Sequence, residues 1–434
     1  MKLFAPKTLT AFKGYQSKDY IFDIVAGIIV AIIALPLSIA LAIASGAKPE
    51  QGLFTAIIAG FVTALLGGSK VNITGPTAAF ATIVAGIIIT QGLDGLFLAT
   101  IMAGILLVLM GVLRVGSLIK YIPHTITVGF TAGIAVTLVI GQLKDFFGLT
   151  YPDGVTAIET MEKVKLVAEN ISTFNPWAFG MGLLGLAILI FWPKISKKIP
   201  GSLIAVIVGA LVCLIPVIRV NTIGSLYTIS SALPKFRFPE ITGQKILAVL
   251  PNAFTIALLA GIESLLSCVV SDKMVDDTHN SNTELIALGT SNILVGCFGG
   301  IPATGAIART AANVKNGGKS PLSGMVHAIV LLLILVLLMP LTSYVPMPII
   351  ASILFIVAYN MSEWREFVAV IKTKKWNDIL VLVLTFALTV IFDLVKAIAV
   401  GLVLHYAIVL VRVLINKRKA KKEEVETPIS TQEK

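Results

Sequence analysis

Long uncharged runs separated by short polar segments dominate the pattern of hydrophobic and polar positions along this chain. No Asp, Glu, Lys or Arg occurs in residues 24–47, 51–69, 71–93, 95–113 or 121–143. Residues 320–362 form one uncharged run, which is long enough for two membrane spans of about 20 residues each. With the later apolar segments, these runs predict an all-α polytopic membrane protein of about fourteen segments.

Composition and charge support the same class of protein. Only 13% of the 434 residues are charged, whereas a soluble domain carries about 25%. The formal net charge of +11 lies mainly in the chain ends and short loops, so we assign it to topology and anionic lipid rather than nucleic acid. Basic residues in segment 1–19 and after residue 415 predict a multi-pass protein of the cell membrane with both termini in the cytoplasm. Residues 416–434 are expected to form a disordered tail.

Two similar stretches interrupt the apolar pattern, one at residues 67–79 and the other at 299–311. Each contains a Gly pair, a Pro, a Thr-Gly step and an Ala-rich helix start. Gly and Pro keep the incoming backbone out of a helix, and Thr74 and Thr304 are the expected N-caps. Two such helix starts that face each other would form an anion site from free N–H groups and positive dipole ends. The alternative is that both stretches are ordinary loops between full spans.

Two ionisable residues lie close to these features. Glu263 stands within residues 253–271, which contain no other charge. A carboxylate at membrane depth is costly and usually faces a polar cavity, so we predict that Glu263 carries a coupling proton; permanent structural pairing is the alternative. Arg309 follows the second helix start by about one turn, where its guanidinium could hold an oxyanion. The alternative for Arg309 is that it only balances Glu263.

The sequence contains no signature of an enzyme or of an ATP-driven pump. Walker, GxSxG and HExxH patterns do not occur, and the four histidines are too far apart in sequence to indicate a metal site. We therefore expect no enzymatic activity, no cofactor and no metal. A secondary transporter, driven by an existing ion gradient, is the favoured class of protein.

Several motifs in order along the chain resemble the sulfate permease family (SulP, solute carrier family 26). They lie at residues 34–42, 52–56, 74–78, 261–267, 280–285, 309–314 and 360–363. The resemblance implies two inverted repeats of seven segments, a core domain, a gate domain, and two half-helices that meet at the midplane. It also implies a homodimer. Family members usually carry a cytoplasmic STAS domain after the membrane region, and the resemblance covers the membrane region alone, as expected of either a naturally short member or part of a longer protein.

The resemblance implies a division of the chain into a transmembrane domain at residues 20–415. The core would comprise about 20–118 and 246–340, and the gate about 119–245 and 341–415. The anion would then lie between the starts of the third and tenth spans. The substrate-binding residues carried over from the family pattern are Leu37, Leu41, Thr77, Ala78, Thr304, Gly305, Ala306 and Arg309.

The resemblance also bears on the coupling ion, for which we select Glu263 and Ser267. Glu263 matches the acidic position that some members use for this ion. Sodium-dependent bicarbonate members carry Thr where this chain has Ile307, and Ile307 offers no side-chain oxygen to a hard cation. We therefore predict proton-coupled uptake of sulfate. The alternatives are transport of a C4-dicarboxylate or bicarbonate, and an anion exchanger or channel without proton coupling.

Overall fold

The computed structural model describes residues 4–410 apart from positions 13, 118–122, 153, 154, 156, 158, 197, 198, 393–396, 398, 399 and 409. The expected tail at 416–434 lies outside the described residues. By their internal contacts the described residues form two units. Unit 1 lies within residues 1–120 and 135–360, and unit 2 lies within 121–134 and 361–434.

The N-terminal part of unit 1 consists of a short helix followed by two long apolar ones. They are α1 (Thr8–Ala11), α2 (Ser17–Ala44) and α3 (Pro49–Leu66). Proline at the first position of α3 fixes φ at a helical value, and the N–H that it lacks would have no partner within the helix. The first two uncharged runs of the sequence thus correspond to α2 and α3.

The third and fourth uncharged runs form a strand and a broken helix. After β1 (Thr74–Gly75), a 3₁₀ turn (Ala78–Phe80) leads into α4 (Ala81–Val112). Gly92 breaks α4 because its backbone has φ of 70°, a conformation that favours glycine. The first part of α4 is therefore a half-helix, and the second part is a separate apolar segment.

The middle of the chain crosses from unit 2 into unit 1 within α5. The next elements of unit 1 are mostly apolar helices joined by short turns. They are α5 (His124–Phe147), α6 (Thr160–Glu169), η3 (Ile171–Thr173), α7 (Pro176–Ile195), α8 (Gly201–Val212) and α9 (Ile223–Leu226). Many side chains of α7 and α8 that point outward are large and apolar, as expected for surfaces that face lipid.

The second half of unit 1 repeats the order of the first. Two helices lead to a short strand, and further helices follow it. These elements are α10 (Gly243–Val275), α11 (Ser281–Cys297), β2 (Thr304–Gly305), α12 (Ile307–Lys315), α13 (Pro321–Leu338), η4 (Met339–Tyr344) and α14 (Met347–Met361). Unit 2 contains α15 (Trp364–Lys372) and α16 (Trp376–Ile391).

Small residues allow the helices of unit 1 to pack close together. α4 packs on α10 and α11, while α13 packs on α2 and α3. A Cβ added to Gly104 in α4 would lie 2.6 Å from the carbonyl oxygen of Gly289 in α11. A Cβ added to Gly289 would lie 2.5 Å from the carbonyl oxygen of Gly104. Such close backbone approach is typical of helices that pack within membranes.

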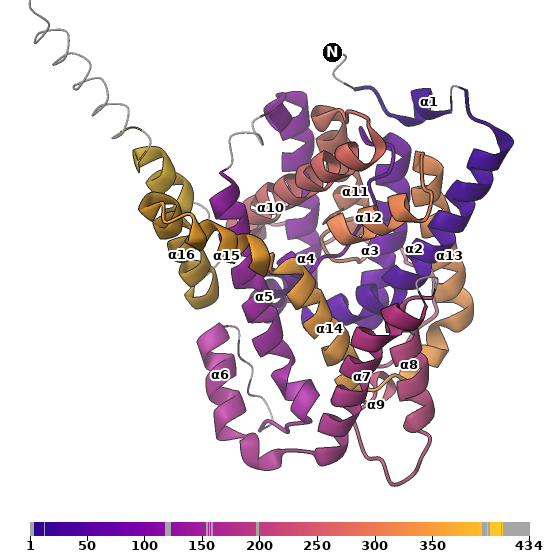
Figure 1. Ribbon diagram of the computed structural model, residues 1–434, viewed down its shortest axis with the longest axis vertical. Coiled ribbons are helices and arrows are strands. Elements are labelled where there is room, and N and C mark those ends of the chain that lie inside the picture. Colours follow the sequence, from indigo (N-terminus) through magenta and orange to yellow (C-terminus); the bar gives the residue numbers. More distant parts are fainter. Residues whose placement is uncertain are drawn as a thin grey trace, which may run out of the picture. The chain divides into compact units, whose positions relative to one another are not determined.

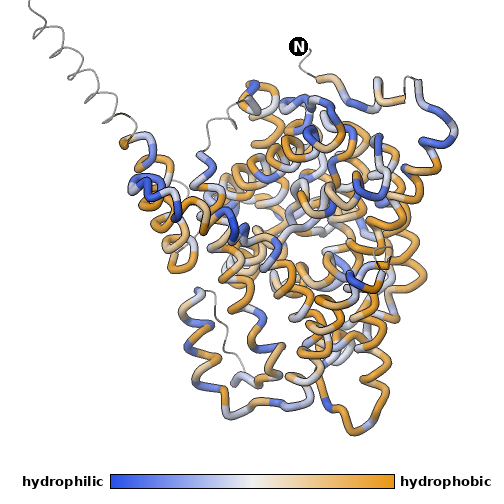
Figure 2. The backbone as a smooth tube through the Cα atoms, in the orientation of Figure 1, coloured by the Kyte–Doolittle hydropathy of each residue, from blue (hydrophilic) through white to orange (hydrophobic). Residues whose placement is uncertain are grey.

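The helices confirm the predicted all-α polytopic membrane fold. Among the described residues, eight helical segments are long and apolar enough to cross a membrane, and α8 and α16 are shorter apolar helices. Figure 2 shows hydrophobic residues along the helices, with many of the hydrophilic ones at helix ends and in loops. All four residues of β1 and β2 are buried; the helices around them are labelled in Figure 1.

Candidate functional site

The centre of unit 1 contains a two-stranded pair formed by the two Thr-Gly steps. β1 and β2 run antiparallel, with Thr74 opposite Gly305 and Gly75 opposite Thr304. The backbone N–H of Ala306 also donates to the carbonyl of Ile73 at 2.9 Å. This register confirms that the two similar stretches of the sequence meet, and it shows that they are not separate surface loops.

The prediction that Thr74 and Thr304 cap the following helices is wrong. Thr77 and Ala306 occupy the two N-cap positions, and neither makes a side-chain capping bond. The Thr-Gly steps are extended because their backbone groups pair across the strands, so each helix begins later in the chain. Thr304 Oγ1 instead donates to the carbonyl of Ala260 in α10 at 2.8 Å.

Arg309 lies in the first turn of α12 and is almost completely buried, with 2% of its surface exposed. Its Nη2 donates to the carbonyl oxygen of Pro76, which precedes the opposite half-helix. Its Nε and Nη1 have no hydrogen-bond partner. A Cβ on Gly75 would collide with Nη1, so glycine at this position makes room for the guanidinium.

No ion pair joins Arg309 and Glu263 among the described residues. The alternative that Arg309 serves only to balance Glu263 therefore has no contact to support it. A buried cation without an acidic partner is expensive. Two of its donor atoms thus remain available for an oxyanion that reaches the strand pair.

Glu263 lies in α10 and is half-buried. Its Oε2 accepts a hydrogen bond from Thr77 Oγ1 at 3.1 Å, which ties the carboxylate to the N-cap of the first half-helix. We call residues 67–79 the first arm and residues 299–311 the second arm. Glu263 contacts the first arm through Thr77, and Arg309 belongs to the second.

The other predicted binding residues lie around the same strand pair or on α2. Ala78 and Gly305 are buried, while Ala306 is half-buried at the start of α12. Ile307, which follows, is 38% exposed. On α2, Leu41 is buried and Leu37 is half-buried. Their part in anion binding stays a prediction.

Ser267, predicted as a coupling-ion residue, belongs to a buried hydrogen-bond network. Its Oγ donates to Asn72 Oδ1 at 2.7 Å and to Thr310 Oγ1 at 3.2 Å. Thr310 Oγ1 in turn donates to the same Asn72 oxygen at 3.0 Å and accepts from the N–H of Ile73 at 2.9 Å. Ser267 therefore connects α10 to both arms, and neither of these two partners is Glu263.

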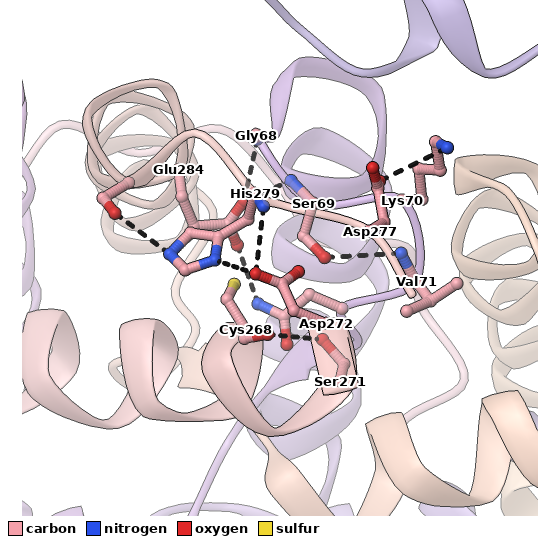
Figure 3. Close-up of polar contacts among 12 residues, drawn as sticks. Gly68, Ser69, Lys70, Val71, Cys268, Ser271, Asp272, Asp277, His279 and Glu284 are labelled. Carbon is pink, nitrogen blue, oxygen red and sulfur yellow. Dashed lines mark hydrogen bonds and ion pairs between the residues drawn. The ribbon is translucent and has the colours of Figure 1, made fainter. Parts of the chain in front are cut away.

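Glu284, for which the sequence suggested no role, anchors the first arm. This fully buried carboxylate in α11 accepts N–H groups from Gly68 at 2.8 Å and Ser69 at 3.2 Å (Figure 3). It also accepts Asn72 Nδ2 at 2.7 Å. A buried carboxylate that accepts several N–H groups is well satisfied, so Glu284 fixes the path that leads into β1.

The second arm is held in an equivalent way by neutral side chains. Thr55 in α3 donates to the carbonyl of Ile301 and accepts its N–H, both at 2.8 Å. Asn292 in α11 likewise exchanges two hydrogen bonds with Ala303, at 2.9 and 3.0 Å. Each arm is thus fastened to rigid helices before it reaches the strand pair.

One end of unit 1 carries a set of charged contacts next to the first arm. Asp277, just after α10, accepts hydrogen bonds from Lys7 Nζ and lies 3.3 Å from Lys70 Nζ. Partial burial acts to raise the pKa of Asp277, but the hydrogen bond from Lys7, the N–H of Thr278 and the nearby lysine charges outweigh it. The pKa of Asp277 is therefore lower than usual.

A histidine stands beside this charged set. His279 Nδ1 lies 2.7 Å from Asp272 Oδ2 (Figure 3), and the backbone N–H of His279 donates to the same oxygen at 3.0 Å. Its Nε2 lies 3.0 Å from Ser281 Oγ. These contacts close the turn between α10 and α11. His279 therefore has a structural role there, and its position in the sequence does not indicate a metal ligand.

Two helix starts joined by a strand pair beside the buried Arg309 are typical of a class of protein, the membrane transporters that bind a substrate between broken helices. A family model described as the sulfate permease family matches residues 21–412. The chain belongs to this family.

Several relatives of this chain are named as anion transporters. A Bacillus subtilis protein named "Putative sulfate transporter YvdB" is 45% identical over 91% of this chain and 74% of its own length. "Bicarbonate transporter BicA" of Picosynechococcus is 32% identical over 87% of this chain and 68% of its own length. The family and these relatives are transporters rather than enzymes.

Solved structures agree with the fold. The transmembrane domain of a cyanobacterial bicarbonate transporter, BicA, superposes with a TM-score of 0.80 at 28% identity, covering 88% of this chain and 98% of that one. The inward-facing murine SLC26A9 anion transporter gives a TM-score of 0.85 at 18% identity, over 94% of this chain and 71% of that chain.

Proposed function

We propose that the protein is a secondary transporter that takes up sulfate together with a proton. The observation that carries this proposal is Arg309, a buried guanidinium with two unpartnered nitrogen atoms between two helix starts. Backbone donors and a guanidinium suit a small oxyanion, which they bind through charge-assisted hydrogen bonds. The anion would lie against Thr77, Ala78, Thr304, Gly305, Ala306 and Arg309, with Leu37 and Leu41 on α2 nearby.

Sulfate is the first choice among substrates because relatives from bacteria and plants carry that name. Bicarbonate is a second candidate, favoured by the two relatives named as bicarbonate transporters, at 32% and 30% identity. A C4-dicarboxylate is the third. Backbone donors do not distinguish these anions, so the volume left by side chains such as Ile307 would decide between them.

Glu263 is the proposed proton carrier. The hydrogen bond from Thr77 links this carboxylate to the helix start that would hold the anion, so a change in its charge is felt at the site. Ser267 would support the coupling indirectly, because it holds Asn72 and Thr310 at the base of the arms. An exchanger or channel of the same fold would not require Glu263 to change its protonation.

We infer alternating access by movement of a core against a gate. The core would comprise about residues 20–118 and 246–340, and the gate about 119–245 and 341–415. We further propose a homodimer in the cell membrane with both termini in the cytoplasm, since basic residues gather at both ends of the sequence.

The test is uptake of radiolabelled sulfate into proteoliposomes with and without an inward proton gradient. We expect the gradient to drive accumulation in the wild type, while Glu263→Gln keeps only the gradient-independent exchange. The matched control is Glu240→Gln, because Glu240 is an exposed loop residue paired with Lys245. Parallel uptake of fumarate and bicarbonate identifies the substrate.

Two results would contradict parts of the proposal. Uptake of bicarbonate or fumarate without any uptake of sulfate would keep the mechanism and replace the substrate. Gradient-independent sulfate uptake that is equal in the wild type and in Glu263→Gln would remove proton coupling and leave an exchanger or channel.

A further inference from the structure

A polar pocket of about 410 Å³ lies in unit 1, and none of the residues that line it belongs to the strand pair. Its walls come from the end of α5 and the following turn, the start of α7, the segment before α9 and the start of α14. Figure 1 shows that α5 ends and α7 begins at the end of unit 1 opposite the N-terminal segment. The polar lining residues are Lys144, Asp145, Thr150, Asn175, Arg219 and Asn221.

Hydrogen bonds between distant segments build the walls of this pocket. Asn175 Nδ2 donates to the carbonyl of Arg219 at 2.8 Å, and the N–H of Asn175 donates to the carbonyl of Phe147 at 3.0 Å. The N–H of Met347 donates to the carbonyl of Asn221 at 2.8 Å. Four segments are therefore locked around the space, which makes it a preformed site rather than a gap between loose loops.

Three of the residues that line the pocket are charged. Lys144 and Arg219 supply two positive charges and Asp145 one negative charge, and no ion pair links any of them within the described residues. Lys144 Nζ stands 4.8 Å from the ring centre of Tyr151, a contact that leaves its N–H donors available. The lining residues thus carry an excess of positive charge.

The start of α7 strengthens this positive character. Asn175 Oδ1 accepts the N–H groups of Trp177 at 2.9 Å and Ala178 at 3.4 Å. Because Asn175 already accepts these N–H groups, they do not donate to a ligand in the pocket. The start of α7 contributes only the positive end of its helix dipole. A ligand would therefore be held by Lys144 and Arg219.

We propose that this pocket is a second anion site, separate from the site at Arg309 and open to the face of the membrane opposite the N-terminus. Its ligand is a small oxyanion that retains a proton, such as hydrogencarbonate. Arg219 and Lys144 bind the charged oxygen atoms, while Asp145 accepts the hydrogen bond from the protonated one. A carboxylate accepts hydrogen bonds only from a donor, so Asp145 disfavours a fully deprotonated dianion such as sulfate.

Isothermal titration of purified full-length protein with hydrogencarbonate and with sulfate tests the proposal. Arg219→Gln is expected to weaken hydrogencarbonate binding at this site about tenfold or more, and Arg219→Lys to retain most of it. Asp145→Asn is expected to strengthen sulfate binding about tenfold, because it removes the only negative charge. Opposite effects of two neighbouring substitutions exclude a general loss of folding.

Two further variants separate this site from the proposed transport site. Arg309→Gln should remove binding at the strand pair and leave a component that Arg219→Gln abolishes. Lys245→Gln, which alters an exposed ion pair elsewhere in unit 1, should change neither component. Binding that is insensitive to both Arg219→Gln and Asp145→Asn, or absent from the wild type at tens of millimolar anion, would overturn the second site. Binding that survives unchanged in Arg309→Gln would instead contradict the transport site.

Discussion

The two arms that meet at the strand pair have nearly the same backbone but different chemistry. Each consists of a Gly pair, a Thr-Gly strand and a helix start, and each is fastened to neighbouring helices. From residue 71 to residue 79 the first arm carries no charge, and its N-cap Thr77 donates to Glu263. The second carries Arg309, whose guanidinium crosses to the carbonyl of Pro76 in the first arm.

In the proposed coupled transporter, this difference would separate two tasks, which are to bind the anion and to respond to the proton. The repeated backbone supplies donors from both sides of one small space, and it does not depend on particular side chains. The side chains then give a fixed positive charge to one arm and a carboxylate contact to the other. Because β1 pairs with β2 and Arg309 donates to the carbonyl of Pro76 in the first arm, we expect a change of charge in one arm to affect the other.

The largest expected effect comes from removing the charge of the second arm. Arg309→Gln should raise the KM for sulfate uptake by about 30-fold or more, because loss of one partner of a buried charged interaction costs at least about 2 kcal/mol. Arg309→Lys keeps the charge but not the fork-shaped donor set, so its KM should lie between the two. Uptake kinetics in proteoliposomes measure both.

A thermal unfolding curve for each Arg309 variant is the control, because Arg309 also fastens Pro76. A Gln variant that folds and keeps the wild-type KM would contradict the assignment of Arg309 to the anion site. Equal KM values for the Lys and Gln variants would show that charge is not the property that matters.

A smaller effect is expected from the two threonines that distinguish the arms. Thr77→Val removes the hydroxyl that donates to Glu263 and so disfavours its charged form; the pH at which uptake is half-maximal should move upward. Thr304→Val removes a hydrogen bond to the carbonyl of Ala260, which should cost about 1 kcal/mol of stability, and it leaves the contact between Thr77 and Glu263 in place. Uptake against pH and thermal unfolding distinguish the two outcomes.

If the two arms differ as described, the pH of half-maximal uptake shifts in Thr77→Val and does not shift in Thr304→Val. The reverse result, or equal shifts in both variants, would show that the arms do not divide the tasks as we describe. A double variant should give the sum of the separate effects only if the two hydroxyls act independently.

The sequence predicted the arms because their signal is local. Gly, Pro and Thr-Gly in the same order at residues 67–79 and 299–311 indicate two breaks in apolar helices, and the structure joins them. It did not predict the caps, because Thr74 and Thr304 are used for strand pairing across more than two hundred residues. Pairing of that kind leaves no pattern near either residue.

The supports of the site were missed for a similar reason. Glu284 occurs close to the end of an apolar segment, where a carboxylate usually meets water, yet it is fully buried against Gly68 and Ser69. The pocket around Lys144 and Arg219 is assembled from segments whose order in the sequence gives no hint of proximity. Single residues within apolar runs, such as Glu263, are visible in a sequence; groups gathered by folding are not.

The smallest expected effect concerns the segment that fastens only the first arm. The backbone N–H of Lys7 donates to the carbonyl of Gly67 at 2.9 Å, and its Nζ donates to Asp277 at 2.9 Å. Lys7→Gln should destabilise the protein at neutral pH by roughly 1 kcal/mol or less, since the pair is partly exposed. Thermal unfolding of the wild type and the variant from pH 2 to 8 measures the difference.

The sign of the pH dependence follows from the lowered pKa of Asp277. Its contribution is fully present above the pKa of an unfolded Asp, about 3.9, and is lost as the pH falls through the lower pKa of the folded protein. The difference between wild type and Lys7→Gln should therefore be constant from pH 8 to about 5 and decrease below that. Lys165→Gln, in an exposed pair with Glu169, is the matched control. A difference that grows with acid would show that Lys7 acts through another group and that the first arm is fastened differently.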